Sequence, residues 1–530
     1  MKNELKNFND ASGGDYSPSN DKGISRRGFL QNAAAVGAAL VATRTAFGER
    51  PATSENMIEQ DERIKEKSPK TAEQIAAFAL RAGDADFTAE AKQRLKLSVL
   101  DALGCAIGAM GGEPVQKIRF VNEEFGGREQ CTMIGGGKIS ADRAALYNVA
   151  LVRYLDFMDN FAAKGEVCHP AVNFGAMLTV AEFANRSGKD LLVALAVAYQ
   201  IHCRLIEETP TMRFGLQNTV PEAYAVAAGA AKLLGLNQTQ TANAVALGGV
   251  SNLALANIQA EPLSNWKGLS SAGTAQVSVH NTFLARAGIT GPLSVLDGPK
   301  GLFELVRSEP NIDWSKEGLD VAMRCSIKKY NGEFQSQTVI ETALDMRREN
   351  NLDGGNIESI TLDVPGGAYE VIGGGEYGSK DDPKIKEQAD HNLKYMVAVA
   401  LLDGDLYPEQ YTNERINRSD VQTLLKKVTV RPQVALTARI PQELPCKVTI
   451  ALAGNRTVQK EKADYEGFYK RPMTRLKVAE KFNRLTAPFA DANLRNEIVS
   501  AVENLENIQV ADLVGLLTRV RGAAAKTSGE

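Results

Sequence analysis

Apolar residues recur at intervals of three and four over most of the stretch from Thr71 to about Arg307. This spacing places them on one face of a helix, so it predicts a succession of amphipathic helices. Glycines follow several of the periodic runs, which is typical of helix ends. Two further runs are so rich in alanine that the helices they predict must pack closely. The clearest periodic runs are 72–80, 89–106 and 191–205, and the alanine-rich runs are 223–234 and 274–287.

The pattern changes after Cys325, where short alternating runs appear. Alternation of apolar and polar residues is typical of half-buried strands, and Gly454 between the last two runs predicts a hairpin. Helical periodicity interrupts the strands twice, and it returns at Thr474 and lasts to about Arg521. The predicted strands are 357–364, 427–430, 445–452 and 455–458, and the interleaved helices are 335–348 and 389–402.

These patterns predict a mainly α protein with a large all-helical domain and a smaller α+β domain. The helical domain is discontinuous, because the α+β domain is inserted before the C-terminal helices. The expected boundaries are a signal peptide at 1–50, a linker at 51–67, the helical domain at 68–322 and 467–525, and the α+β domain at 323–466. Glycines gathered between Gly366 and Gly378 predict a flexible loop in the α+β domain, a candidate mobile flap.

The N-terminus carries the pattern of a twin-arginine export signal. Arg26 and Arg27 precede a weakly apolar run at 30–42, and small residues near Gly48 offer a cleavage site. The run is shorter than the roughly 20 residues of a membrane span, and Arg44 interrupts it. We therefore expect the twin-arginine export machinery as a partner, no stable membrane anchor, and a periplasmic or secreted protein. The alternative is an ordinary basic N-terminus.

The formal net charge is −3 and 44% of the residues are hydrophobic, which indicates neither nucleic-acid binding nor bulk membrane binding. Affinity for an acidic ligand must therefore come from individually placed lysines and arginines. The six cysteines are scattered singly, without metal-finger or redox spacing. Several lie in apolar runs, as Cys105 does, and are predicted to be small buried residues. Export would permit a disulfide, but the sequence identifies none.

The chain has only 4 histidines, and one of them follows a short acidic segment. Asp156 and Asp159 are three residues apart, so on a helix they would share one face. Gly165 interrupts that pattern, and Pro170 suits the first turn of a new helix, with His169 at its N-cap. A helix start favours neutral imidazole and attracts an anion, a combination suited to proton abstraction next to a carboxylate. The alternative is that His169 and Pro170 only form a helix-start turn.

The runs 101–108 and 153–159, together with His169 and Pro170, resemble the MmgE/PrpD family. The resemblance extends in the family's order over nearly the whole chain after the N-terminal segment. It implies an active site in the cleft between the two domains and a homodimer built on the helical part. The implied activity is that of a carbon–oxygen lyase, a dehydratase acting on a 2-methylcitrate-like hydroxylated di- or tricarboxylate. The further family-like runs are 266–268, 326–330, 389–395, 397–404 and 479–482.

The resemblance also assigns cations to the carboxylates of such a substrate. Lys267 follows Trp266 in a region of small and apolar residues and is implied to bind a carboxylate; a solvent-exposed lysine is the alternative. Lys328 falls at the junction of the two domains, where a lysine binds a carboxylate as a point charge. Tyr330 is expected to donate a proton or a hydrogen bond, with an ordinary packed aromatic as the alternative.

The remaining candidates are polar groups around these lysines. Asp159 is implied to hydrogen-bond the substrate hydroxyl or to orient His169, whereas Asp156 has a structural alternative, a pair with Arg153. His391 resembles a position in the family's smaller domain, where it either faces the cleft or caps a helix. The other two histidines match no motif and are interpreted as structural, namely His202 and His280.

The chain departs from the family at several positions. Many relatives carry a histidine where this chain has Asn218 and another where it has Gln335, and Asn160 and Asn331 replace a threonine and a proline. Asn218 and Gln335 are expected to bind substrate, but an amide cannot titrate. Fewer acids are then left for a departing hydroxide, so an epimerase or isomerase and a decarboxylase are alternatives. An exported carboxylate-binding protein without catalysis is another.

For the dehydratase, we expect His169 to abstract the proton while Lys267 and Lys328 stabilise the developing enediolate. Asp159, with Tyr330 or a water, would handle the hydroxyl. No cluster of His, Cys and carboxylates has metal-ligand spacing, and there is no nucleotide-binding fingerprint. We therefore expect neither a metal nor a cofactor, and a small-molecule carboxylate as the substrate.

Overall fold

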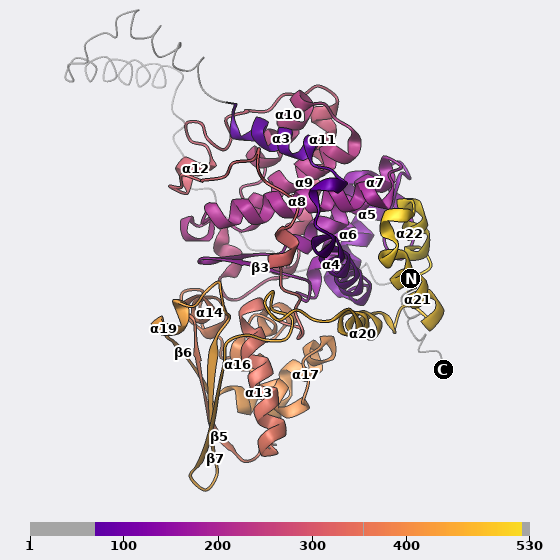
Figure 1. Cartoon of the computed structure of the whole chain (residues 1–530). Helices are drawn as coiled ribbons and strands as arrows, with labels where there is room; N and C mark the ends of the chain where they lie inside the picture. The colour runs from indigo at the N-terminus through magenta and orange to yellow at the C-terminus, as the bar shows by residue number, and fades with distance from the viewer. Residues whose placement is uncertain (1–68, 353, 522–530) are drawn as a thin grey trace, which may run out of the picture. The chain divides into compact units, whose positions relative to one another are not determined.

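Helices follow one another along the first half of the chain, as the periodicity predicts (Figure 1). The computed structural model describes residues 69–352 and 354–521, so the expected signal peptide and linker lie outside the described residues. The protein is mainly α with a small α+β part, which confirms the predicted fold class. The helices of the first half are α3 (Thr71–Arg81), α4 (Ala89–Gly108), α5 (Glu113–Phe125), α6 (Ala141–Tyr154), α7 (Asn173–Phe183), α8 (Gly188–Glu208), α9 (Thr219–Leu234), α10 (Gln238–Val250), α11 (Ser270–Arg286) and α12 (Leu302–Leu305).

Small residues let these helices approach closely. α9 packs against α8, α10 and α11, and the two alanine-rich runs of the sequence fall in α9 and α11. A Cβ on Gly248 of α10 would lie 3.0 Å from the carbonyl oxygen of Ala223 in α9. One on Gly175 of α7 would lie 2.7 Å from the amide nitrogen of Val149 in α6. The close packing predicted from the alanine-rich runs is confirmed.

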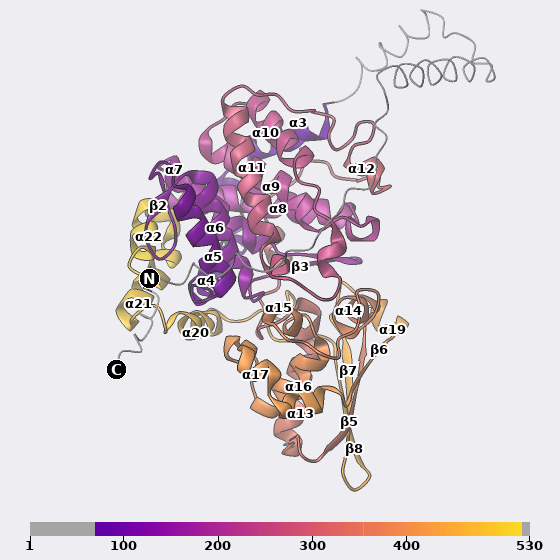
Figure 2. The ribbon, with the colours of Figure 1, turned by 180° about the vertical axis from the view of Figure 1, so that it is seen from behind.

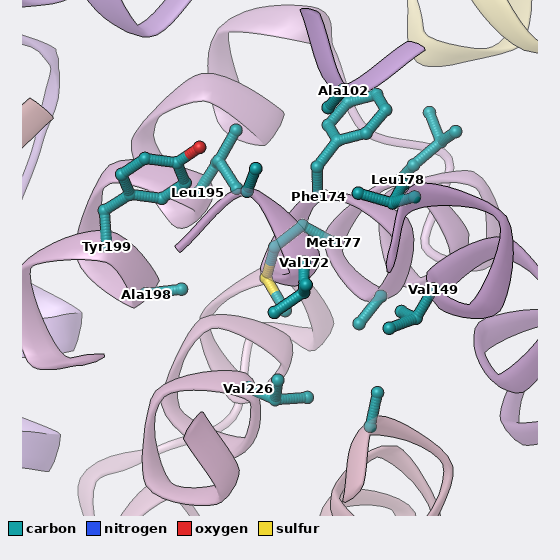
Figure 3. Packing of buried hydrophobic residues seen from close by; sticks show 14 of the residues in the cluster. Ala102, Val149, Val172, Phe174, Met177, Leu178, Leu195, Ala198, Tyr199 and Val226 are labelled. Carbon is teal, nitrogen blue, oxygen red and sulfur yellow. The ribbon is translucent and has the colours of Figure 1, made fainter. Parts of the chain in front are cut away.

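The helix that follows His169 is anchored in the middle of this core. Figure 3 shows Phe174 and Met177 of α7 among buried side chains that include Leu195 of α8 and Val226 of α9. Each such fully buried side chain contributes roughly 1.5–3 kcal/mol of hydrophobic stabilisation. The start of α7, and with it the turn at His169, is therefore held by packing on several sides. All six cysteines are buried free thiols, as several were predicted to be.

Two short antiparallel hairpins connect helices of the first half. β1 (Cys131–Thr132) pairs with β2 (Lys138–Ile139), and β3 (Phe161–Ala163) pairs with β4 (Glu166–Cys168). The second hairpin lies between the acidic segment after α6 and His169. It therefore brings the end of the acidic segment close to His169.

The α+β part contains a four-stranded sheet in the order β6 (Val428–Pro432), β5 (Ile357–Val364), β7 (Cys446–Leu452) and β8 (Arg456–Lys462). β5 runs parallel to β6 and antiparallel to β7, and β7 and β8 form the predicted hairpin around Gly454. Figures 1 and 2 show α13 (Gln337–Asn350) and α16 (Leu393–Asp403) on one side of this sheet, which they contact. Shorter helices complete this part, namely α14 (Gly366–Ala368), α15 (Lys386–Ala389), α17 (Asn413–Asn417), α18 (Ser419–Leu425) and α19 (Val434–Thr437).

The chain returns to the helical part after β8. α20 (Arg475–Thr486) packs along α4, where a Cβ on Gly104 would lie 3.2 Å from the Cα of Phe482. α21 (Ala492–Glu503) and α22 (Val510–Leu517) then contact α4 and α7, so the helical part is discontinuous in sequence. Within the described residues no single helix is long and apolar enough to cross a membrane; α4 and α5 reach that length and composition only as a pair, bent by 83°.

The helix predicted for the acidic segment is wrong. α6 ends at Tyr154, and Asp156 and Asp159 lie in the loop that follows, where Asp156 has a φ of 53°. Aspartate tolerates this left-handed conformation better than most residues. Arg153 and Lys328 bind Asp156 and hold the loop in place.

The loop predicted for the glycine segment is also partly wrong. α14 continues directly into a π-helix over Tyr369–Gly373, and a turn begins only at Gly374. Gly373 lies against β6, where a Cβ would be 2.9 Å from Val430 Cγ1. Because Gly373 has no side chain, the π-helix can pack closely against the sheet at this point.

Candidate active site

Asp156 is the centre of a buried cluster of charges. Its Oδ1 accepts a hydrogen bond from Arg153 Nη1 at 2.6 Å, which confirms the predicted pair. Lys328, which is completely buried, donates from Nζ to the Asp156 carbonyl oxygen at 2.7 Å and lies 3.2 Å from Oδ2. Burial alone would raise the pKa of Asp156, but Lys328 and Arg153 hold that pKa well below its usual range. Asp156 is therefore an ionised, structural carboxylate that ties the helical part to the segment leading into the α+β part.

His169 begins a single 3-10 turn, Pro170–Val172, that leads into α7, so the predicted helix start lies one turn ahead of the α-helix itself. Its Nδ1 is 2.7 Å from Asn160 Oδ1, while Asn160 Nδ2 donates to the carbonyl oxygen of Met158 at 2.9 Å. Because an amide oxygen can only accept, Nδ1 of His169 carries the proton. The lone pair of Nε2 is then left free to act as a base.

The imidazole of His169 is neutral. Burial and the charge of Arg153 lower the pKa of His169 well below its usual range, and Lys267 adds to this, against an opposing effect of Asp156. The residue as a whole is half-buried. A neutral imidazole was predicted from its position at a helix start. In the structure, the imidazole is neutral because it is buried and lies near cations.

Asp159 holds the turn at His169 through the backbone. Its Oδ1 accepts a hydrogen bond from the amide of Ala171 at 3.0 Å, and its Oδ2 accepts one from the hydroxyl of Tyr199 at 3.0 Å. The side chain is fully buried, and burial raises the pKa of Asp159 to about 6. The residue that contacts the His169 ring is Asn160 and not Asp159.

Lys267 provides an unpaired cation in the same cluster. It lies in a 3-10 turn, Asn265–Gly268, and only 5% of its surface is exposed. Within the described residues its Nζ has no hydrogen bond and no ion pair, in contrast to Lys328. Burial and the charge of Arg153 lower the pKa of Lys267 to about 7. A bound carboxylate would stabilise the charged form, so this position suits an anionic ligand.

His391 joins the cluster from the α+β part. Its Nδ1 lies 2.6 Å from Asp390 Oδ1, and its Nε2 lies 3.7 Å from Asp156 Oδ2. Burial and the charge of Lys267 lower the pKa of His391 to about 4. The cap of α16 is the next residue, Asn392, whose side chain accepts a hydrogen bond from Tyr395. His391 therefore does not cap α16, and its ring contacts the charged cluster instead.

Three predicted site residues lie apart from this cluster. Tyr330 packs in the core of the α+β part, where burial and the nearby Glu341 raise its pKa. Asn218, at the start of α9, donates from Nδ2 to the carbonyl oxygen of Val167 at 2.6 Å. The side chain of Gln335 lies against Gly367. Each of them has a structural contact that explains its position.

Two family-like runs meet in a buried ion pair beneath the site. Lys481 of α20 lies 2.6 Å from Asp101 Oδ1 of α4, and its Nζ also donates to the carbonyl oxygens of Phe157, at 2.7 Å, and Lys328, at 2.9 Å. Lys481 thereby fixes the loop of Asp156 relative to Lys328. Neither Lys481 nor Asn160 was predicted to belong to the site. The sequence did point to both residues, because Lys481 lies in the family-like run 479–482 and Asn160 stands where the family resemblance implies a threonine.

A separate cavity of about 400 Å³ lies in the α+β part, between the glycine segment and β6. Its two lysines are already paired: Lys380 with Glu261, and Lys394 Nζ with Asp381 Oδ1 at 2.7 Å. The cavity therefore offers no free charge to an acid ligand. None of the predicted site residues lines it.

Comparison with known proteins assigns the chain to a family. The model of the MmgE/PrpD N-terminal domain matches residues 73–315, and that of the MmgE/PrpD C-terminal domain matches residues 330–507. The chain belongs to the MmgE/PrpD family. The first domain carries Asp156, His169 and Lys267, and the second carries His391. The charged cluster of this MmgE/PrpD protein is thus built from both family domains.

Its relatives in the MmgE/PrpD family are enzymes. The chain is 25% identical to cis-aconitate decarboxylase of Mus musculus over 474 residues, which cover 82% of this chain and 91% of the relative. It is 25% identical to the human protein of the same name over 465 residues, 81% of this chain and 90% of the relative. It is also 25% identical to 2-methylcitrate dehydratase of Escherichia coli K12 over 359 residues, 64% of this chain and 73% of the relative. These similarities support an enzyme.

Proposed function

We propose that this chain is a lyase that acts on a 2-methylcitrate-like hydroxylated di- or tricarboxylate and removes the proton next to a carboxylate. The observation that carries the proposal is a neutral His169 with a free Nε2 in the same charged cluster as the unpaired Lys267. The charge of Lys267 acts on the pKa of His169, so the two groups share one electrostatic environment. A base and a cation in one electrostatic environment suit the abstraction of a proton alpha to a carboxylate.

In this proposal Lys267 binds the substrate carboxylate and His169 Nε2 accepts the proton from the adjacent carbon. Negative charge develops on the carboxylate as an enediolate, and Lys267 stabilises it. The electron pair then forms the carbon–carbon double bond, and the hydroxyl on the next carbon departs. Lys328 holds Asp156 in place and adds positive charge behind the site.

Decarboxylation of a related acid is the second candidate. It is favoured by the extent of the similarity, because the mouse decarboxylase aligns over 82% of this chain and the E. coli dehydratase over 64%. Asn218 and Gln335 agree with it, since an amide cannot protonate a departing hydroxide. Decarboxylation expels no hydroxide: the carbon keeps the electron pair of the broken bond and then takes up a proton.

A substrate panel tests the proposal. The purified protein is incubated with 2-methylcitrate, citrate and cis-aconitate, and double-bond formation and carbon dioxide release are followed. Formation of the unsaturated acid supports the dehydratase, and carbon dioxide release supports the decarboxylase. Deuterium uptake at the alpha carbon without either product would indicate an epimerase. If an acid raises the unfolding temperature of the protein but is recovered unchanged, the result would contradict an enzyme and indicate a binding protein.

We also propose that the protein is exported by the twin-arginine route and acts beyond the cytoplasmic membrane as a homodimer without an anchor. The paired Arg26 and Arg27 before a weakly apolar run support export. The family resemblance supports the dimer. Light scattering of the purified protein tests the assembly, and a monomer at micromolar concentration would contradict it.

A further inference from the structure

Glu333 is a buried carboxylic acid at the edge of the charged cluster, and it has no place in the mechanism above. It precedes a 3-10 turn, Phe334–Ser336, that leads into α13, and 8% of its surface is exposed. Its Oε2 accepts a hydrogen bond from the amide of Gln335 at 2.7 Å, and its own amide donates to the carbonyl oxygen of Asp390 at 2.9 Å. The backbone and one side-chain oxygen of Glu333 are therefore fixed.

The other carboxyl oxygen of Glu333 is free. Within the residues that the structure describes, Oε2 is the carboxyl oxygen of Glu333 that accepts a hydrogen bond, and neither Oε1 nor Nζ of Lys267 forms one. The charges of Lys328, Asp156 and Lys267 all act on Glu333. The contact with Asp390 ties it to the neighbour of His391. Base, cation and acid thus share one buried environment, and each has an unoccupied polar atom.

The protonation states of the three carboxyl groups nearby differ for physical reasons. Burial raises the pKa of Glu333 to about 7, against an opposing effect of Lys328, so near neutral pH a large share of Glu333 carries a proton. Asp156 is ionised by its two cations. Both oxygens of Asp159 accept hydrogen bonds from fixed donors. Of these three groups, Glu333 is the one that has both a proton to give and a carboxyl oxygen without a hydrogen bond.

We propose that Glu333 is the general acid of the reaction and donates its proton to the departing hydroxyl of the substrate. The inference rests on the proposed function. The carbon–hydrogen bond breaks, its proton goes to His169 Nε2, and its electron pair becomes the double bond. The carbon–oxygen bond breaks with its pair on oxygen, which takes the Glu333 proton and leaves as water. Solvent then reprotonates Glu333 and deprotonates His169.

The same proton serves the decarboxylation alternative. There the bond from carbon to the departing carboxylate breaks, its electron pair stays on the carbon, and carbon dioxide leaves. The carbon then takes the Glu333 proton. In either reaction the acid stands two residues before Gln335, the position at which relatives carry a histidine. The side chain of Gln335 cannot titrate, and it is the backbone N–H of Gln335 that donates a hydrogen bond to Glu333.

The variant Glu333→Gln tests the proposal, because it keeps the shape and the hydrogen bond to the Gln335 amide but has no acidic proton. We expect kcat on the substrate that the unaltered enzyme turns over to fall about 10²- to 10⁴-fold, the usual contribution of a general acid, with little change in KM. Glu166→Gln is the matched control. Burial likewise raises the pKa of Glu166 to about 7, but its carboxylate accepts a hydrogen bond from the Met212 amide, outside the cluster. It should retain activity within a few-fold.

Leaving-group chemistry separates an acid from a structural residue. For a hydroxy acid substrate, Glu333→Gln should still exchange the alpha proton with deuterated water, since His169 is intact, whereas His169→Ala should not. An analogue with fluoride in place of the hydroxyl needs no proton to depart, and Glu333→Gln should process it about as fast as the unaltered enzyme. Equal losses on both substrates, or normal kcat on the hydroxy acid, would overturn the role of Glu333.

Two controls keep the outcomes distinct. If the unaltered enzyme turns over none of the acids, the proposed function fails and not only the role of Glu333. If Glu333→Gln does not fold, as judged by its thermal unfolding, Glu333→Asp replaces it. Aspartate keeps the acid at a shorter reach, so this variant should retain more activity than Glu333→Ala. Equal activity of the aspartate and alanine variants would overturn the proposal.

Discussion

Lys328 donates a hydrogen bond to the backbone of Asp156 and also faces its carboxylate, at 2.7 Å and 3.2 Å. The two residues are 172 positions apart in the chain. Asp156 lies in the loop after α6, and Lys328 lies in the segment that leads to the α+β part. Because this contact is completely buried, it sets the position of the loop that carries Asn160 and thus of His169. The base of the proposed reaction depends on an ion pair that does not touch it.

Replacing Lys328 by methionine should therefore destabilise the fold. The variant leaves the buried carboxylate of Asp156 with Arg153 as its remaining close cation. Removing one partner of a buried pair typically costs 3–5 kcal/mol, and we expect about 3 kcal/mol because Arg153 stays. Denaturant unfolding measures the loss. Lys329→Met is the control: Lys329 is part-exposed and pairs with Glu466 and with Glu341, which keeps Lys462 and Arg471 as partners, so its loss should cost less than about 1 kcal/mol. Equal losses in the two variants would contradict the role of burial.

Removing the partner of the His169 ring should slow the chemistry more than it weakens substrate binding. Asn160→Ala leaves Nδ1 without its acceptor, so the ring is no longer held in the tautomer with a free Nε2. We expect kcat to fall about 10-fold or more with KM nearly unchanged, and His169→Ala to lose at least ~10². The exposed His280 provides the control variant, His280→Ala, which should behave as the unaltered enzyme. A normal kcat for Asn160→Ala would remove the residue from the mechanism.

The export proposal makes a prediction that does not depend on the enzyme's activity. Changing both Arg26 and Arg27 to lysine preserves the charge of the N-terminus but removes the paired arginines that define the signal. The double variant should stay in the cytoplasm at full length, while the unaltered protein is recovered outside it and shortened. Cell fractionation with an antibody to the C-terminal part measures both. Unchanged export of the double variant would contradict the twin-arginine assignment.

The helices and strands were largely predictable because they depend on local periodicity. β5 covers the predicted run 357–364, and the hairpin of β7 and β8 turns at the predicted Gly454. Asp156 was placed on a helix because its spacing from Asp159 suits one. The chain leaves the helix there, since Arg153 and Lys328 bind the carboxylate in a loop. No local pattern contains an interaction with a residue that is 172 positions away.

The same limit applies to the candidate site. His169 and Lys267 were predicted from the sequence, because the motif residues next to them in the chain resemble the family. Their charge states depend on burial and on Arg153, which only the fold brings near. Glu333 was missed for this reason: an exposed glutamate and a buried acid are identical in sequence. Tyr330 was predicted either to donate a proton or a hydrogen bond or to be an ordinary packed aromatic, and it packs in the core of the α+β part.

The pH dependence of the reaction tests these charge states together. In the free enzyme the pKa of Lys267 and that of Glu333 each lie at about 7, so below pH 7 Lys267 is charged and Glu333 is protonated. His169 is still neutral there, because its pKa lies well below its usual range. As pH rises through 7, Lys267 loses its charge and Glu333 its proton. We therefore expect kcat/KM to be highest on the acidic side of neutrality and to fall by up to about 10-fold for each group per pH unit above it.

Lys267→Arg separates the two groups, because a guanidinium keeps its charge throughout this range. In this variant KM should no longer rise between pH 7 and 9, whereas the alkaline decline of kcat, which we assign to Glu333, should persist. Glu333→Gln should show the converse, a low kcat without that decline and a KM that still rises. Steady-state kinetics from pH 5 to 9 on the three proteins decide the matter. A flat kcat/KM above pH 7 in the unaltered enzyme would contradict both assignments, since neither group would then titrate where its burial places it.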